Sequence, residues 1–231
     1  MKTIGLLGGM SWESTVLYYQ IINRTVAGRL GGLHSAKIVL HSVDFAQIER
    51  LQSAGNWDEA GDLIADLAAR LEEAGAEVLV LCTNTMHKIA QAIQARVRIP
   101  LLHIADPTAR AIRQAGLQTV GLLGTRFTME QDFYRTRLEQ EHALTVLIPA
   151  PSDIAIVHRV IYEELCVGKI SETSRAEYRR IMQALVAQGA QCIILGCTEI
   201  TLLVGAHDAT VPLFDTTAIH ARAAALFALG Q

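Results

Sequence analysis

Three short sequence landmarks occur twice in this chain of 231 residues, in the same order each time. They are Gly-Leu-Leu-Gly at residues 5–8 and 121–124, Gly-Ala before an apolar run at 75–76 and 189–190, and Pro-Leu at 100–101 and 212–213. The offsets are 116 (121 − 5), 114 (189 − 75) and 112 (212 − 100) residues. Ordered self-similarity at a nearly constant offset indicates that one structural unit is present twice. The chain is therefore predicted to fold as two similar lobes related by a pseudo-two-fold axis.

Short apolar runs alternate with helical patterns within the first repeat. Strands are predicted at residues 4–8, 37–43 and 77–81, and a helix at 58–74 carries leucines at four-residue spacing on one face. Strands that alternate with helices are typical of βαβ units around a parallel sheet. Ligands of such sheets bind beyond the carboxyl ends of the strands.

The predicted fold class is α/β, with two pseudo-symmetric lobes that each contain a mainly parallel sheet flanked by helices. Residues 1–116 are expected to form the first lobe and residues 117–214 the second. The C-terminal helix, at about 215–231, is expected to pack back on the first lobe. The active site is expected in the cleft between the lobes.

Composition and charge exclude several classes of function. A net charge of −3 and a pI near 6.2 give no electrostatic case for binding nucleic acid. No apolar run approaches the roughly 18 residues that span a bilayer, and the glycine-broken N-terminus does not resemble a secretory signal. The expectation is a cytoplasmic protein that binds neither membrane nor nucleic acid.

Four scattered cysteines, with no Cys-x-x-Cys pair, predict neither a disulfide framework nor a structural zinc site. No group of histidine, cysteine and acidic residues has metal-ligand spacing, and no lysine has a convincing Schiff-base context. The sequence therefore predicts an activity without metal or pyridoxal phosphate, and with no cofactor of another kind.

The two repeats can be aligned without a gap from their Gly-Ala landmarks at residues 75–76 and 189–190. In this alignment Cys82 falls on Gly196 and Thr83 falls on Cys197. Each lobe thus places a hydroxyl or thiol residue at the tip of an equivalent strand, and the two tips are expected to face each other. Two such groups on opposite sides of a small molecule suit removal of a proton from one face and its return to the other.

The same strand ends resemble the signatures of a known family. The segment at 83–87, Thr-Asn-Thr-Met-His, is similar to the Cys-Asn-Thr-x-His motif of the aspartate/glutamate racemases, and Gly-Cys-Thr-Glu at 196–199 matches their second motif. Gly-Gly-Met at 8–10 with Thr15 resembles their N-terminal loop. The resemblance implies a cofactor-independent amino-acid racemase, usually a homodimer, that interconverts L- and D-aspartate or glutamate. Activity on other amino acids is also compatible with it.

The chain departs from the family pattern at the first cysteine, whose position Thr83 occupies. Cys82 lies one residue too early, so its side chain should point to the opposite face of the strand and be a buried core thiol. Cys197 is then the expected base, and by resemblance it faces the L-enantiomer. Because Cys197 precedes a predicted helix start, we expect its pKa to be lowered. A threonine hydroxyl is a far weaker acid, so proton return near Thr83 is expected to need help.

Further residues are candidates for binding the substrate. Lys169, in a link between two helices, resembles the family lysine that meets a distal carboxylate, and either Arg50 or Gln52 is expected where the family brings in an arginine. Glutamine there would suit a less strictly acidic substrate. His87 is open to two interpretations, tuning of the site or helix capping. The full set of candidate substrate-binding residues is Met10, Thr15, Gln52, Asn84, Thr85, Thr125, Lys169, Thr198 and Glu199.

Two other functions remain compatible with the sequence. One thiol suffices to protonate an enolate from one side, so a one-cysteine decarboxylase or isomerase of small dicarboxylates is the first. A non-catalytic protein that binds acidic ligands is the second, although the cysteine kept in Gly-Cys-Thr-Glu argues against it.

Overall fold

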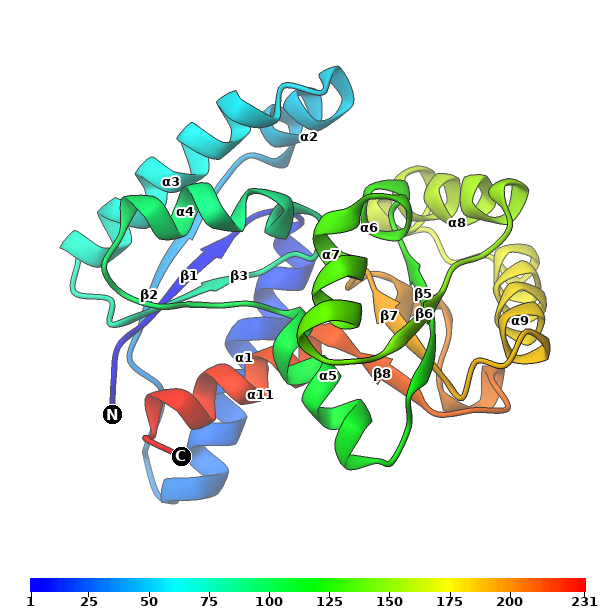
Figure 1. Ribbon diagram of the computed structural model, residues 1–231. Helices are drawn as coiled ribbons and strands as arrows, with labels where there is room; N and C mark the ends of the chain where they lie inside the picture. The colour runs from blue at the N-terminus through cyan, green and yellow to red at the C-terminus, as the bar shows by residue number, and fades with distance from the viewer. The chain divides into compact units, whose positions relative to one another are not determined.

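The computed structural model describes residues 1–231, which divide into two compact units. Unit 1 comprises Met1–Ile104 together with His220–Gln231, and unit 2 comprises Ala105–Ile219. Each unit contains a four-stranded parallel sheet flanked by helices, which confirms the predicted α/β class (Figure 1). None of the helices has the length and apolar character required to cross a membrane.

Unit 1 is built on a sheet with the strand order β2-β1-β3-β4, in which all neighbouring strands run parallel. Its elements in chain order are β1 (Ile4–Gly8), α1 (Trp12–Leu30), β2 (Ile38–Ser42), α2 (Phe45–Ala54), α3 (Trp57–Glu73), β3 (Val78–Leu81), the 3-10 turn η1 (Thr85–Ile89), α4 (Ala90–Arg96) and β4 (Leu101–Leu102). The strands and the long helix predicted from periodicity are thus present, with bounds that differ by one residue at most.

Two apolar cores cover the two faces of this sheet. On one face, α1 packs with the last helix, α11 (Thr216–Ala228), through buried residues such as Tyr18, Ile22 and Ala224. On the other face, α2, α3 and α4 pack against the sheet through residues such as Ile48 and Ile64. Residues 220–228 of α11 and the three residues after the helix thus belong to unit 1 (Figure 1).

Unit 2 repeats the sheet with the strand order β6-β5-β7-β8, again entirely parallel. Its elements in chain order are α5 (Ala105–Gln114), β5 (Thr119–Gly124), α6 (Arg126–Glu130), α7 (Asp132–Thr136), the π-helical turn η2 (Arg137–Glu141), β6 (Thr145–Leu147), α8 (Pro151–Glu163), η3 (Leu165–Val167), α9 (Glu172–Ala187), β7 (Cys192–Gly196), α10 (Ile200–Leu203), η4 (Ala206–Asp208) and β8 (Leu213–Asp215).

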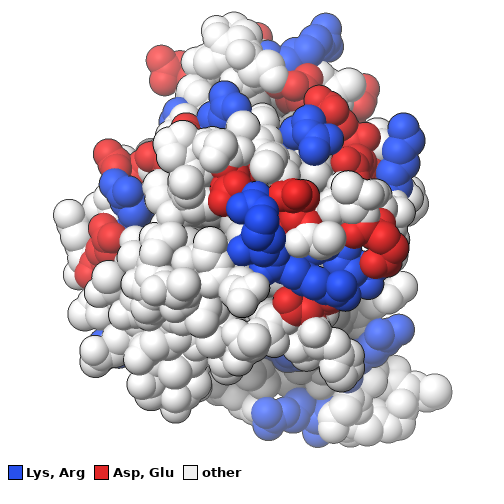
Figure 2. Space-filling view, turned by 90° about the vertical axis from the view of Figure 1, so that its right-hand side faces the viewer, with Lys and Arg blue, Asp and Glu red and all other residues white.

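Basic and acidic side chains are interleaved over α8 and α9, on the face turned toward the viewer in Figure 2. Arg180 of α9 pairs with Asp153 of α8 at 2.6 Å and with Glu177 at 2.8 Å. Arg159 pairs with Glu164 at 3.3 Å. Of these pairs, Arg180–Asp153 joins the two helices, whereas the other two lie within α9 and at the end of α8.

The strand registers repeat along with the sequence. Leu7 of β1 pairs with Leu81 of β3, and Leu123 of β5 pairs with Leu195 of β7. Because each pair lies in the same place in its own sheet, the gapless alignment of the two repeats holds in three dimensions. Thr83 and Cys197 are therefore each two residues beyond equivalent rungs.

The helix after the fourth strand belongs in each case to the other unit. After β4, α5 is part of unit 2, and after β8 most of α11 is part of unit 1. The sequence placed residues 105–116 in the first lobe, whereas the structure assigns them to unit 2. There Asp106 of α5 forms a paired contact with Arg137 of η2, which ties α5 to this unit.

Candidate active site

The predicted site residues are divided between the two units. Most of them follow the carboxyl end of a strand, whereas Gln52 lies in α2 and Lys169 lies in the turn before α9. In unit 1, the backbone N–H of Cys82 still bonds to the carbonyl of Leu7 at 2.9 Å, and that of Thr83 turns back to the carbonyl of Leu81 at 2.9 Å. The sheet ends at this turn, and η1 begins two residues later. Thr83, Asn84 and Thr85 are all buried at the turn.

Cys82 is a core thiol, as its position in the strand predicted. Its side chain is fully buried in the core formed with α1 and α11. Burial raises the pKa of this thiol far above its ordinary value. Leu81 lies in the core on the other face, so neighbouring side chains alternate as in any strand. Cys82 therefore cannot replace the missing cysteine at position 83.

Thr15 organises the N-terminal loop of unit 1. Its hydroxyl accepts a hydrogen bond from the N–H of Gly9 at 2.8 Å and donates one to the carbonyl of Ser11 at 3.1 Å. A Cβ at Gly8 would lie 2.4 Å from the Thr15 side chain, so only glycine fits there. Met10, at the centre of this loop, is buried against the core. Thr15 thus holds the loop in shape, whereas the sequence had suggested only that it lines the pocket.

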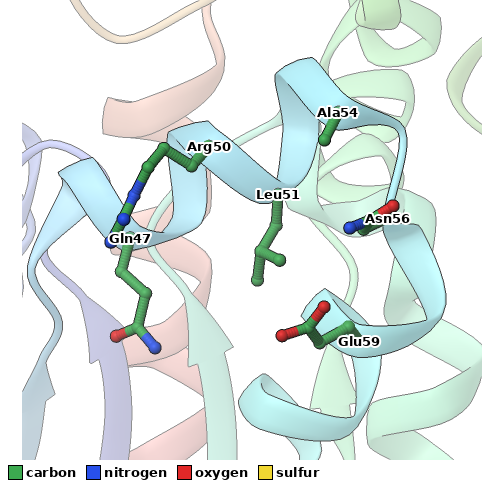
Figure 3. Close-up of a pocket in the computed structure, with 6 residues that line it drawn as sticks. All are labelled: Gln47, Arg50, Leu51, Ala54, Asn56 and Glu59. Carbon is green, nitrogen blue, oxygen red and sulfur yellow. The ribbon is translucent and has the colours of Figure 1, made fainter.

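The two candidates for binding the substrate in this region, Gln52 and Arg50, lie on different sides of helix α2. Gln52 is buried, and its Nε2 lies 2.9 Å from Sδ of Met86, in the strand-end segment. Arg50 is exposed, and its Nε bonds to the carbonyl of Ala46 at 3.3 Å. It lines a separate open hollow of about 340 Å³ between α2 and α3, together with residues that include Leu51 (Figure 3). Of the two residues, Gln52 therefore contacts the segment that follows β3, through Met86 of η1.

In unit 2, Cys197 leaves the end of β7 next to Thr125, which leaves the end of the neighbouring strand β5. The two follow Gly196 and Gly124, which pair with each other. The Thr125 hydroxyl caps α6 by accepting from the N–H of Thr128 at 3.3 Å. Thr125 was expected to bind substrate, and its capping role does not conflict with that expectation.

The side chains of the Gly-Cys-Thr-Glu motif converge on one carboxylate oxygen. Oε2 of Glu199 accepts a hydrogen bond from the Cys197 thiol at 3.0 Å and another from the Thr198 hydroxyl at 2.6 Å. Thr198 and Glu199 are buried, and Cys197 is partly exposed. A thiol, its nearest proton acceptor and a supporting hydroxyl thus lie within a single turn.

The pKa of Cys197 is raised, in contrast to the expectation from the sequence. Loss of water around the thiol, then the charge of Glu199 and nearby Cys166, and the hydrogen bond to Glu199 all favour the protonated thiol. The helix expected to lower the pKa is α10, which has only four residues and begins at Ile200. So short a helix has little dipole to oppose the nearby carboxylate. At rest the thiol therefore keeps its proton.

Lys169 lies in an exposed turn between η3 and α9. Gly168 adopts a left-handed conformation with φ 73°, and the N–H of Lys169 bonds to the carbonyl of Glu164 at 2.8 Å. Glu164 is fixed in turn by the Ser174 hydroxyl, which donates to its carboxylate at 2.6 Å. The η3 turn packs against α10, which follows the Cys197 segment. The turn thus presents a charged, solvent-accessible amine from a fixed backbone.

A cluster that the sequence did not reveal lies elsewhere in unit 2. Asp106, Glu141 and His142 bring possible metal-ligand atoms within 4.8 Å of one another. However, Arg137 binds both oxygens of Asp106, at 2.6 and 2.9 Å, and Glu141 at 3.1 Å. His142 also lies 3.1 Å from Asp106. A guanidinium already neutralises these carboxylates, so the cluster is best described as an ion-pair network.

Two parallel sheets with polar strand ends in equivalent positions define a duplicated α/β protein. The sequence profile of the Asp/Glu/hydantoin racemase family matches residues 7–224. The chain therefore belongs to that family, whose enzymes are isomerases.

Individual relatives cover most of the chain. A candidate Asp/Glu racemase from Yersinia pestis, known from a crystal structure, is 61% identical with a TM-score of 0.93, over 99% of this chain and 100% of that one. An aspartate racemase homologue from Pyrococcus horikoshii is 32% identical with a TM-score of 0.84 over the same shares. The broad specificity amino-acid racemase RacX of Bacillus subtilis is 24% identical over 172 residues, 71% of this chain and 70% of that protein.

Proposed function

We propose that this chain is a cofactor-independent racemase that interconverts L- and D-aspartate or glutamate and accepts some other amino acids. The observation that carries the proposal is the equivalence of Thr83 and Cys197, each two residues beyond the same rung of its sheet. Racemisation needs one group for each face of the α-carbon, and a duplicated fold provides two equivalent positions. The names of the relatives, which include an aspartate racemase homologue and a broad specificity racemase, support the substrate class.

The first half-reaction uses the Cys197–Glu199 pair. The thiol passes its proton to the Glu199 carboxylate, 3.0 Å away, and the resulting thiolate takes the α-proton of the L-amino acid. The C–H electron pair stays on the α-carbon and is delocalised into the substrate carboxylate. Glu199 thus acts as the acceptor that makes a thiol with a raised pKa usable as a base.

The second half-reaction returns a proton to the opposite face. The Thr83 hydroxyl donates its proton to the α-carbon, and the alkoxide that remains recovers a proton from water. The hydroxide formed in this way takes up the proton held by Glu199, so that Thr83, Cys197 and Glu199 all return to their starting states. Because a hydroxyl is much less acidic than a thiol, this half is the slower one. The enzyme is therefore expected to exchange the α-proton of the L-isomer faster than it racemises it.

Recognition of the substrate is assigned to both units. The polar groups at the strand ends, with Asn84, Thr85 and Thr198, suit the α-carboxylate, and Lys169 suits a distal carboxylate. Gln52 offers an amide in place of a cation, which tolerates neutral side chains as well as acidic ones. On the basis of the family we also propose that the enzyme is a cytoplasmic homodimer.

The decisive experiment follows deuterium incorporation from heavy water into L-aspartate and D-aspartate, without added cofactor. Wild type should label the L-isomer readily and the D-isomer slowly. The Cys197→Ala variant should lose labelling by about 10²-fold or more, since a general base contributes about 10²–10⁴-fold. The Cys192→Ala variant, which removes a buried thiol within strand β7 of the same unit, is the matched control and should keep it. Undiminished labelling by Cys197→Ala would refute the assignment.

A second candidate function follows from the single thiol at the two strand ends. A decarboxylase or isomerase of small dicarboxylates needs one proton donor, which Cys197 alone provides. Release of carbon dioxide from a substituted malonate, without deuterium exchange in any amino acid, would favour this function over racemisation.

A further inference from the structure

We infer that His87 is a positioning residue for the Thr83 half of the site. Its neutral imidazole, protonated at Nδ1, bridges the ends of strands β3 and β4 and fixes the turn that carries the Thr83 hydroxyl. This inference rests on the proposed function, in which Thr83 returns the proton.

The bridge begins where the strand ladder stops. The last paired residues of β3 and β4 are Val80 and Leu102, so no ladder bond joins the chains beyond them. Nδ1 of His87 lies 2.8 Å from the carbonyl oxygen of Thr83, and its Nε2 lies 3.2 Å from the backbone nitrogen of Ile104. The ring therefore stands in for the next rung between the two strand ends.

The two partners assign the tautomer. A carbonyl oxygen only accepts, so Nδ1 must carry the proton that is donated to Thr83. A backbone N–H only donates, so Nε2 must be the unprotonated acceptor for Ile104. Protonation of Nε2 would set two donors against each other. In this state both ring nitrogens of His87 are hydrogen-bonded to backbone groups, and the ring supplies no proton to the substrate.

Neighbouring aromatic groups hold the imidazole in place. His87 is 2% exposed, and its ring centroid lies 4.5 Å from that of His103 and 5.9 Å from that of His220. His220 is itself anchored, since its Nε2 lies 2.8 Å from the carbonyl of Leu102 and its Nδ1 lies 2.8 Å from the Tyr18 hydroxyl. Strand β4 is thus fixed by one histidine beside its last residue and by another just beyond it.

The rung matters because Thr83 is the weaker of the two proposed acid–base groups. Proton transfer depends on the position of the donor atom, and misplacement by about 1 Å can cost about 10²-fold in rate. Without hydrogen bonds beyond the strand end, the carbonyl of Thr83 could change its orientation. The side chain of Thr83 would then change direction with it. His87 removes that freedom, while the Cys197 half lies in the other unit and does not depend on it.

Three substitutions of His87 test its two hydrogen bonds one at a time. His87→Asn places an amide N–H near the position of Nδ1 and keeps the bond to Thr83. His87→Gln places an amide oxygen near the position of Nε2 and keeps the bond to Ile104. His87→Phe fills the volume and makes neither bond. His34→Phe, at an exposed position, is the control for histidine loss.

The measurements are circular dichroism for folding, deuterium wash-in to L-aspartate for the Cys197 half, and L-to-D turnover for the whole reaction. His87→Phe should racemise about 10- to 100-fold more slowly, with KM and L-side wash-in within about threefold of wild type. His87→Asn should recover most of the lost kcat and His87→Gln much less. A parallel loss of wash-in and turnover in His87→Phe, or no advantage of Asn over Gln, would overturn the inference.

A readout that needs no activity tests the geometry separately. In protein with ¹⁵N-labelled histidine, the signals absent from His87→Asn should report a protonated Nδ1 and an unprotonated Nε2. The other tautomer, or an imidazolium at neutral pH, would disprove the rung. If wild type shows the expected tautomer but no wash-in, the proposed function fails and the assigned role in catalysis fails with it, whereas the structural bridge stands.

Discussion

The Cys197 thiol and the Glu199 carboxylate form a hydrogen bond of 3.0 Å, within a motif of four consecutive residues. An anion beside a thiol opposes its ionisation, and the same anion is the nearest acceptor for its proton. The pair therefore keeps Cys197 neutral at rest and, in the proposed mechanism, supplies the acceptor for its proton. Its consequences for pH can be measured directly.

We expect Cys197 to be alkylated slowly at neutral pH and increasingly fast above the ordinary thiol pKa of 9.0, because its own pKa is raised. Only the thiolate reacts, so a raised pKa moves the whole rate profile toward alkaline pH. Glu199→Gln removes the charge and should move the profile toward lower pH, while α-proton exchange falls for lack of the acceptor. Mass spectrometry of the Cys197 peptide after iodoacetamide treatment measures this. A native midpoint below 9.0 would contradict it.

Cys82→Ala should keep most of the α-proton exchange, since this thiol is buried in the core of unit 1. Loss of the sulfur leaves a small cavity and should lower the free energy of unfolding by about 1 kcal/mol or somewhat more. Cys192→Ala, at an equally buried strand position in unit 2, is the matched control. Exchange as low as in Cys197→Ala would show that the alignment of the repeats is displaced by one residue.

Thr83→Cys should restore a thiol at both strand ends and speed up deuterium entry into D-aspartate by at least about tenfold, part of the 10²–10⁴-fold that an acid–base group contributes. Thr83→Val removes the hydroxyl at nearly constant volume, and should stop racemisation while L-side exchange continues. Because the equilibrium constant between enantiomers is one, kcat/KM must stay equal in both directions in every variant. Equal wash-in of the two enantiomers in wild type would mean that Thr83 is already a fully competent base.

Gln52→Ala and Arg50→Ala should differ although both change helix α2. Gln52 lies against Met86 at the strand end, so its loss should raise KM for aspartate by about 2- to 12-fold, the equivalent of one hydrogen bond. Arg50 is exposed over the α2–α3 hollow, and its replacement should change KM by less than about twofold. Initial rates with aspartate and a neutral amino acid measure both effects. A larger effect at Arg50 would return the substrate-gripping role to that residue.

Asp106→Asn should lower the free energy of unfolding by about 1–3 kcal/mol, since it disrupts a partly buried, bidentate ion pair with Arg137. Although burial acts to raise it, hydrogen bonds and charge from Arg137 and His142 hold the pKa of Asp106 below 3.8. The stabilisation is therefore complete above 3.8 and lost as pH falls through the lower, folded-state value. Urea titrations at several pH values test this, with the more exposed Asp66→Asn as a control of under about 1 kcal/mol.

Local sequence was sufficient for the parts of this protein that depend on nearest neighbours along the chain. Hydrophobic periodicity predicted the strands and the long helix of the first repeat. The internal repeat predicted two equivalent parallel sheets and aligned Thr83 with Cys197. The alignment is reliable because successive side chains of a strand point to alternate faces, so that equivalent positions have equivalent directions. The buried state of Cys82 followed from the same alternation.

Tertiary structure decided the features that depend on which segments meet. The sequence could not choose between Arg50 and Gln52, which lie two residues apart on opposite sides of one helix. It missed the contact of Asp106 with Arg137, 31 positions away, and the contact of His87 with Ile104, 17 positions away. It also gave the wrong sign for the pKa of Cys197. Secondary structure is set by short-range geometry, whereas the charge state of a group is set by the sum of its surroundings, which exist only after the chain has folded.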